Sequence, residues 1–282
     1  MPALPTLSPT ASYSLVAVVA WGFSDFMGGY FTRRTEAFLF ATLVNCGGLT
    51  LAAVMVLATH ATLPTLHGAG WALAGGLSGG ASLAIFYRAL ASGRMGLVAP
   101  VAAVLSAAIP AIFSMFTEGA PGPVRVTGFV LAALGLWLIT RPQNGSSPEG
   151  IGLALIAGIG FAGFYLCVRQ AGDSSVICTA GLVRVGALLT TLPVVLWQGR
   201  LGELNRGNIG WGVLTGCLDS AGTMVFALAS QSGRLDEAVV ISSLYPAITV
   251  LLARFVLNEH FHRWRFVGLL ATLAAVPMIA AR

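Results

Sequence analysis

The sequence predicts an all-α membrane protein with ten transmembrane helices, built as two inverted repeats of five helices each. Three observations predict this fold. Of the 282 residues, 56% are hydrophobic and only 9% are charged, whereas a soluble domain carries about 25% charged residues. The apolar residues gather in ten runs, each close to the roughly 20 residues that a membrane-crossing helix needs. Finally, short phrases from the first half of the chain recur in the second half.

Short polar breaks separate the ten apolar runs. Two of them, residues 33–36 and 118–123, carry charges, glycine and proline, which are residue types of turns and loops. The longest polar stretch, residues 141–150, separates the fifth run from the sixth. The predicted helices span residues 12–31, 36–58, 68–90, 96–117, 124–140, 151–169, 175–197, 209–230, 237–257 and 264–281. The predicted domains are a first repeat at 12–141, a linker at 142–150 and a second repeat at 151–281.

The two halves share phrases at a nearly constant offset. Ser-Gly-Arg at residues 92–94 recurs at 232–234, an offset of 140, and Gly22-Phe23-x-x-Phe26 matches Gly160-Phe161-x-x-Phe164 at an offset of 138. A period this long indicates a duplicated domain. Because five helices per repeat is an odd number, the second repeat enters the membrane upside down. Inverted repeats are typical of secondary transporters, whose substrate site lies near the midplane where the repeats meet.

Charge and cysteine content exclude several other classes of protein. The net charge is +5 and all 15 basic residues are arginine. Most lie singly at the ends of apolar runs, as expected for side chains that reach the membrane interface, so we expect no nucleic-acid partner. The four cysteines lie within apolar runs at no metal-ligand or disulfide spacing, so we expect neither a metal nor another cofactor. The first 11 residues hold no lysine or arginine, which argues against a cleaved signal peptide.

Three ionisable residues fall well inside predicted spans, where charges are costly and usually face a cavity or a partner. Arg184 and Asp219 lie near the centres of the seventh and eighth helices, so their shared depth allows a salt bridge. Asp25 lies roughly 5 Å from the midplane at 1.5 Å per residue. One hypothesis is that Arg184 binds a substrate carboxylate while Asp25 or Asp219 carries a proton. The alternative is a structural ion pair between two helices.

Other residues are expected to line a mixed aromatic and polar cavity near these charges. Asn45 corresponds to Arg184 in the other repeat, allowing one residue of slippage, which places both near the pseudo-two-fold axis. Arg88 could reach the interface or line the mouth of the cavity. The further residues expected to face inward are Trp21, Tyr87, Ser106 and Tyr245.

Positions near the helix ends and prolines inside helices complete the candidate residues. Glu118 and Glu259 end the fourth and ninth helices, and we expect them to order the loops that follow. Pro100 and Pro246 lie within predicted helices that follow the two copies of Ser-Gly-Arg. Proline kinks a helix by removing an internal hydrogen bond, so these two are candidate hinges for alternating access, with static bends as the alternative.

The chain resembles EamA-domain proteins of the drug/metabolite transporter superfamily. The resemblance rests on Ala20-Trp21-Gly22-Phe23-Ser24-Asp25-Phe26, on Phe86-Tyr87-Arg88-Ala89-Leu90, and on Tyr245-Pro246 with Asn258-Glu259. It implies a ten-helix transporter of the bacterial plasma membrane that moves amino acids, other metabolites or drug-like compounds, often by export. It also implies proton coupling or facilitated diffusion, and both termini in the cytoplasm. By contrast, the two sides of the predicted topology hold 4 and 8 arginines, which by the positive-inside rule puts the N-terminus outside.

Rival functions are a passive channel or facilitator and a membrane protein without transport activity. Residues 76–80 fit the G-x-S-x-G pattern of serine hydrolases, but all four histidines lie in predicted loops, so no base is available and we expect no enzyme. The glycines of this stretch also follow the G-x-x-x-G spacing that lets membrane helices approach closely. We expect them to pack within the molecule, with a homodimer seam as the alternative, so the chain is a monomer or a homodimer.

Overall fold

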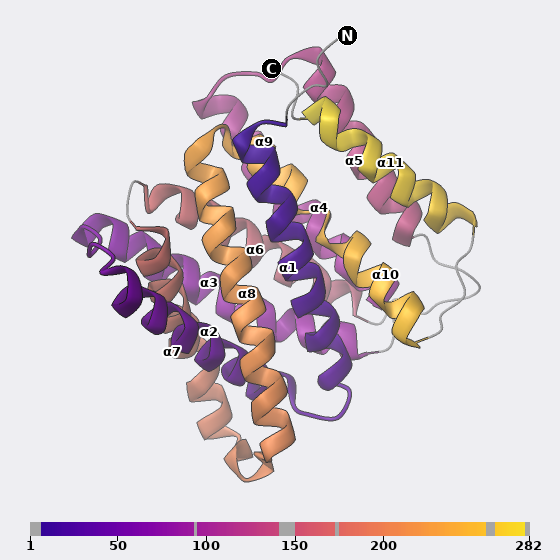
Figure 1. Ribbon diagram of the computed structural model, residues 1–282. Coiled ribbons are helices and arrows are strands. Elements are labelled where there is room, and N and C mark those ends of the chain that lie inside the picture. Colours follow the sequence, from indigo (N-terminus) through magenta and orange to yellow (C-terminus); the bar gives the residue numbers. More distant parts are fainter. Residues whose placement is uncertain (1–6, 93–94, 141–149, 173–174, 258–262, 280–282) are drawn as a thin grey trace.

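Every predicted apolar run contains helix in the computed structural model, which describes residues 7–92, 95–140, 150–172, 175–257 and 263–279. The helices begin within three residues of the predicted starts. In chain order the elements are α1 (Pro9–Phe31), α2 (Ala37–Thr59), α3 (Leu66–Ala91), α4 (Met95–Thr117), α5 (Pro123–Thr140), α6 (Ile151–Gln170), α7 (Val176–Trp197), the 3₁₀ turn η1 (Arg200–Glu203), α8 (Arg206–Ser232), α9 (Leu235–Ser242), α10 (Tyr245–Leu257) and α11 (Arg263–Ile279). Figure 1 shows their arrangement.

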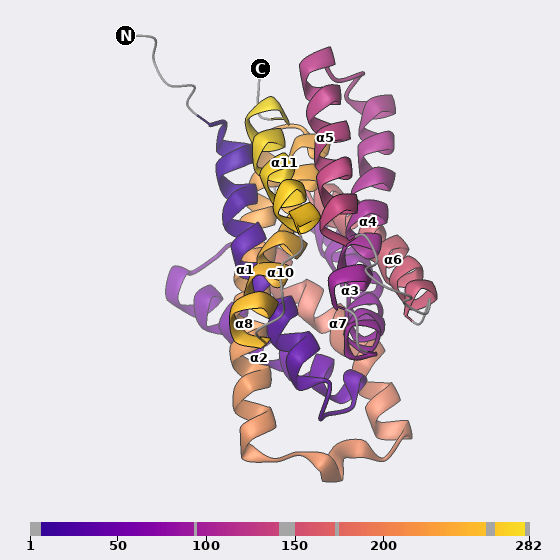
Figure 2. The same cartoon turned by 90° about the vertical axis from the view of Figure 1, so that its right-hand side faces the viewer.

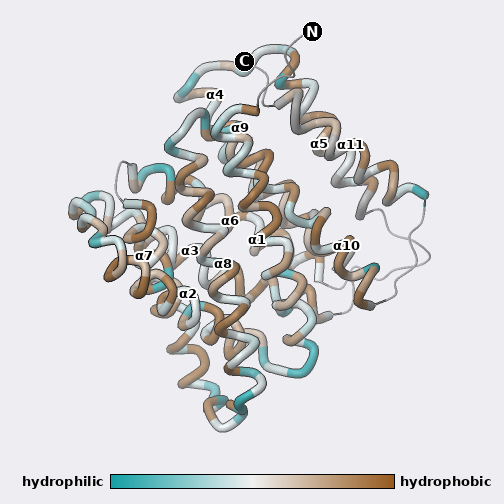
Figure 3. Tube along the Cα trace, in the orientation of Figure 1, coloured by the Kyte–Doolittle hydropathy of each residue, from teal (hydrophilic) through white to brown (hydrophobic). Residues whose placement is uncertain are grey.

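The prediction of an all-helical membrane protein is confirmed. Within the described ranges there is no strand, and seven helical stretches are long and apolar enough to cross a membrane. Two shorter apolar helices, Val101–Thr117 and Pro123–Gly135, accompany them. Apolar residues cover the helices while polar residues gather at helix ends and connections (Figure 3). The predicted linker 142–150 falls almost wholly outside the described residues, as do Gly93 and Arg94 of the first Ser-Gly-Arg.

Polar side chains fix the starts of the long helices. Ser8, Glu36, Thr65 and Asn205 precede α1, α2, α3 and α8, and each accepts a hydrogen bond from a first-turn backbone N–H at 2.8–3.1 Å. A side-chain oxygen at this position satisfies a donor that the helix itself leaves unpaired. The breaks between apolar runs therefore supply helix starts as well as loops.

Helices from the two halves of the chain pack against one another. α3 packs on α6 and α7, α2 on α7 and α8, α1 on α8, α9 and α10, and α4 on α6. α5 and α11 lie side by side along one edge (Figures 1 and 2). Few of the large contacts join helices of the same half, so the centre of the molecule lies where the two halves meet.

Glycines allow these inter-half contacts to be close. A Cβ atom placed on Gly76 of α3 would lie under 3.0 Å from the carbonyl oxygen of Val183 in α7. A Cβ atom on Gly216 of α8 would come equally close to the carbonyl oxygen of Val44 in α2. Gly75 and Gly79 face side chains of α6. The glycine stretch of α3 therefore packs against α6 and α7 within the molecule.

The ninth predicted span is broken, which corrects the prediction of one continuous helix over 237–257. α9 ends at Ser242, and α10 begins at Tyr245 after Ser243 and Leu244. Pro246 has no N–H to donate to the carbonyl of residue 242, four positions earlier, which favours a break at this point. Pro246 thus lies in the first turn of α10, where no such donor is needed, whereas Pro100 lies within continuous α4.

Candidate functional site

A cavity opens where helices of both halves meet. Side chains of α1, α2, α3, α6, α7, α8 and α10 line it, and it holds about 550 Å³ of space including its opening. Six of the predicted site residues line the cavity: Trp21, Asp25, Asn45, Arg184, Asp219 and Tyr245.

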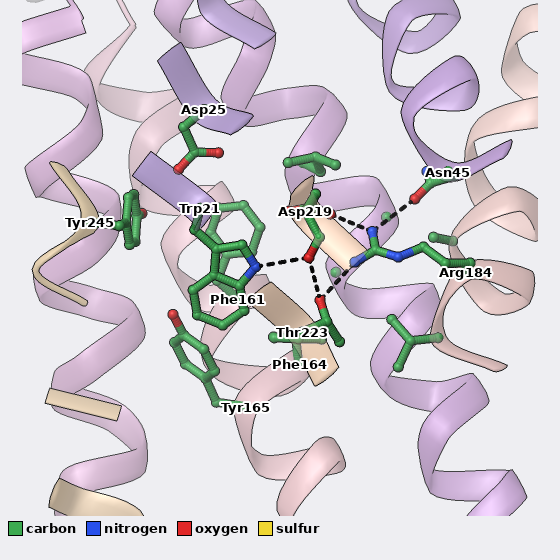
Figure 4. Close-up of a pocket in the computed structure, with 15 residues that line it drawn as sticks. Trp21, Asp25, Asn45, Phe161, Phe164, Tyr165, Arg184, Asp219, Thr223 and Tyr245 are labelled. Carbon is green, nitrogen blue, oxygen red and sulfur yellow. Dashed lines mark hydrogen bonds and ion pairs between the residues drawn. The ribbon is translucent and has the colours of Figure 1, made fainter. Parts of the chain in front are cut away.

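The salt bridge that the sequence allows between Arg184 and Asp219 is present. Their Nη1 and Oδ2 atoms lie 2.5 Å apart, and the residues are only 4% and 7% exposed. The guanidinium also donates to the Oδ1 of Asn45 at 3.3 Å and to the Oγ1 of Thr223 at 2.7 Å. A buried charge needs such partners, because removing it from water is costly. The pair therefore joins α7 to α8, and Asn45 adds α2 (Figure 4).

The backbone carbonyl of Asp219 connects this pair to the aromatic side of the cavity. It accepts from Trp21 Nε1 at 3.2 Å and from Thr223 Oγ1 at 3.0 Å. The Trp21 ring packs against Phe164, with ring centroids 6.2 Å apart, and against Tyr165, at 5.9 Å. One wall of the cavity is thus a fixed aromatic cluster that spans α1 and α6.

Asp25 faces the same cavity from α1 but stands apart from the ion pair. It is 6% exposed, and its carboxylate points toward Trp21 and Tyr245 (Figure 4). Among the described residues no side chain or backbone group hydrogen-bonds to it, and no cation pairs with it. The cavity therefore contains one neutralised pair and one carboxylate without a counter-charge.

The structure does not bring three of the predicted site residues to the cavity. Tyr87 is fully buried, but its ring packs on Phe40, with centroids 6.1 Å apart. Ser106 is also buried and donates to the carbonyl of Ala103. Arg88 lies on an exposed face of α3, which matches a side chain that reaches the interface and not one at the mouth of the cavity.

Sequence reasoning missed nine of the fifteen lining residues, among them Phe161, Phe164, Tyr165 and Thr223. A signal for two of them existed. Phe161 and Phe164 belong to the repeated Gly-Phe-x-x-Phe phrase, whose first copy lies within the helix that carries Trp21 and Asp25. Thr223 lies one helical turn after Asp219 and therefore on the same face of α8.

A second charged cluster joins several helix ends away from the cavity. Glu118, which follows α4, pairs with Arg169 of α6 at 3.1 Å and accepts from the backbone N–H of Leu235 at 3.1 Å. Arg234 donates to the carbonyl oxygens of Glu118 and Gly119 at 2.8 and 2.6 Å. Glu118 was expected to order the loop after its own helix, yet its carboxylate holds the start of α9. Glu259 lies outside the described residues.

We expect substitutions at Glu118 to destabilise the protein in a graded way. Glu118→Gln keeps an oxygen acceptor for Leu235 but loses the ion pair with Arg169, so the free energy of unfolding should fall by about 1 kcal/mol. Glu118→Ala also leaves the Leu235 N–H without its acceptor, so the loss should reach about 2–3 kcal/mol. Reversible unfolding in detergent measures both. The control is Glu203→Gln, in an exposed pair with Arg200, which should unfold like the wild type; equal stability of both Glu118 variants would contradict this role.

Comparisons with known proteins agree with this architecture. A solved structure described only as "Crystal structure of protein" superposes with a TM-score of 0.76 over 97% of this chain and 96% of that chain, at 15% sequence identity. That likeness shows the fold alone. A comparison with curated proteins finds no match.

Helices long enough to span a membrane surround this cavity, and together with a family match they imply a membrane transporter. Residues 148–281 match the sequence model of the EamA-like transporter family. The chain thus carries an EamA-like transporter family domain, part of the drug/metabolite transporter superfamily, as the resemblance implied. This is a transporter family and not an enzyme family.

Proposed function

We propose that the chain is a secondary transporter that exports small organic metabolites, amino acids among them, across the bacterial plasma membrane. It works by alternating access about the cavity between two inverted five-helix repeats, residues 12–141 and 151–281. The observation that carries the proposal is the position of the cavity, which side chains from both halves line together. Substrate sites of inverted-repeat transporters lie at such junctions. Export and the plasma membrane come from the family resemblance.

The contacts between the halves support the inverted repeat. α3 packs on α7 through Gly76, while α8 packs on α2 through Gly216, and the two glycines correspond at the offset of 140. Arg184 and Asn45, which correspond at an offset of 139, hydrogen-bond to each other. Contacts that exchange corresponding residues in this way are expected near a two-fold axis. Rocking of one repeat against the other would then open the cavity to either side in turn.

Asp25 is the carboxylate available for proton coupling, because Asp219 is engaged by Arg184. Pro100 and the break before Pro246 remain the proposed hinges. Tyr245, which lines the cavity, directly precedes Pro246, so a change in angle between α9 and α10 would move a lining side chain. We propose a monomer as the working unit, since the glycines of α3 are used within the molecule.

Uptake and counterflow in proteoliposomes test the proposal. Vesicles with the purified protein, given a pooled mixture of labelled amino acids and metabolites, should accumulate at least one compound saturably. Unlabelled compound inside the vesicles should accelerate that uptake. Protein-free vesicles are the negative control. The variant Gly70→Ala, which adds a methyl group at an open position of α3, should transport as the wild type does. Uptake that neither saturates nor shows counterflow would favour the rival function, a passive channel.

A further inference from the structure

The cavity holds one acidic side chain without a cationic partner in the part of the chain that the structure describes. The lining residues include one arginine, Arg184, and two aspartates, Asp219 and Asp25. Arg184 and Asp219 form an ion pair at 2.5 Å and neutralise each other. Asp25 is left with no cationic partner among the described residues, although it is 6% exposed. A buried carboxylate is costly unless a cation or a proton neutralises it. A proton or a bound cation must therefore neutralise Asp25 when it is buried in the cavity.

The surroundings of Asp25 are aromatic. Trp21, Phe161, Phe164, Tyr165 and Tyr245 line the same cavity, and several of their rings pack on one another and hold their positions. Aromatic faces carry negative potential and attract organic cations, above all where water is excluded. A carboxylate beside such rings is a combination that favours an ammonium group over an anion or a neutral group.

We propose that the cavity takes substrates through an ammonium group, which Asp25 neutralises while the aromatic wall holds the apolar part of the substrate. This inference rests on the proposed transport function and specifies its substrate class as amines with an apolar substituent. An amino acid would be held by its amino group at Asp25, and not by its carboxylate at Arg184, because Asp219 already neutralises the charge of that guanidinium. Arg184 then serves to shape the cavity.

Three ligands that share a phenylpropyl skeleton test the charge preference directly. Calorimetry on the full-length protein in detergent would compare 3-phenylpropylamine, 3-phenylpropan-1-ol and 3-phenylpropionate, with protein-free micelles subtracted. The amine should bind saturably, and at least tenfold more tightly than the alcohol or the carboxylate, since one charge-assisted contact and cation–π attraction distinguish them. Binding of the alcohol or the carboxylate as tight as that of the amine, or no binding by any of them, would overturn the proposal.

Two variants locate the site. Asp25→Asn keeps the shape of the side chain and should lower amine affinity at least tenfold, while leaving affinity for the alcohol unchanged. Trp21→Leu should lower amine affinity about fivefold to tenfold through the lost ring face, and it keeps the test valid if Asp25→Asn does not fold. The matched control is Glu203→Gln, which removes an exposed carboxylate that does not line the cavity. This variant should bind the amine as tightly as the wild type does. Full amine affinity in Asp25→Asn would contradict the assignment.

The outcome separates this inference from the proposed function. Saturable counterflow of a metabolite together with no preference for the amine would leave the transporter standing and refute the ammonium site. Selective amine binding without uptake or counterflow in vesicles would support the ammonium site and refute transport.

Discussion

Asp219→Asn is expected to lower the free energy of unfolding by about 3–5 kcal/mol, because it strands the charge of Arg184 inside the protein. Arg184 is 4% exposed, so water cannot replace the lost carboxylate. Asn45 and Thr223 would still accept hydrogen bonds from the guanidinium, but neither carries a compensating charge. Unfolding of wild type and variant in the same detergent measures the effect.

The double variant Arg184→Met with Asp219→Leu separates a structural role from a role in transport. With both charges gone, no uncompensated charge is buried, and stability should return to within about 1–2 kcal/mol of the wild type. We expect this folded double variant to have lost transport, because the polar side of the cavity has become apolar. Arg184→Ala alone should also abolish transport.

The outcome for the ion pair can contradict us in two ways. A double variant that transports at the wild-type rate would show that Arg184 and Asp219 have no role in transport and only link α7 to α8. A single Asp219→Asn variant as stable as the wild type would mean that the Arg184 guanidinium reaches water, contrary to its burial. The exposed pair of Arg200 and Glu203 provides the control, since its removal should leave stability unchanged.

The sequence was sufficient to predict the helices and the central ion pair, for physical reasons. A bilayer demands spans of fixed length with few charges, so composition alone locates them. Charges inside a span need partners, so the shared depth of Arg184 and Asp219 allowed a contact that the structure contains. The internal offset placed Asn45 and Arg184 near the pseudo-two-fold axis, and in the structure their side chains hydrogen-bond.

The sequence was insufficient to assign the faces of the helices. An apolar residue in a membrane helix can face lipid, another helix or a cavity with similar stability. Hydropathy therefore did not identify Phe161 or Tyr165 as cavity-lining residues. Neighbours on a helix point in different directions, which is why Tyr87 is buried and Arg88 exposed. The partners of Glu118 come from α6 and from the start of α9. The residues next to Glu118 in the sequence do not predict contacts with segments so far along the chain.

Gly76→Ala in α3 and Gly216→Ala in α8 are expected to be among the most damaging single-methyl additions at the glycines that the structure describes. At either position the new Cβ would meet a backbone carbonyl oxygen, of Val183 or Val44, at a distance that real Cβ atoms do not adopt. A backbone atom cannot rotate away as a side chain can, so the two helices must move apart. We expect a loss of about 3 kcal/mol or more, at or above the upper end of the usual cost of overpacking, or failure to fold.

Two matched substitutions isolate the cause. Gly70→Ala in α3 and Gly210→Ala in α8 add the same methyl group to the same helices, but nothing lies within 4 Å of the new atom. Since alanine favours a helix over glycine by about 1 kcal/mol, these variants should be as stable as the wild type or slightly more so. If Gly76→Ala and Gly216→Ala also gained stability, the two halves would not touch through these glycines. That result would refute the close contacts of α3 with α7 and of α2 with α8 that surround the cavity.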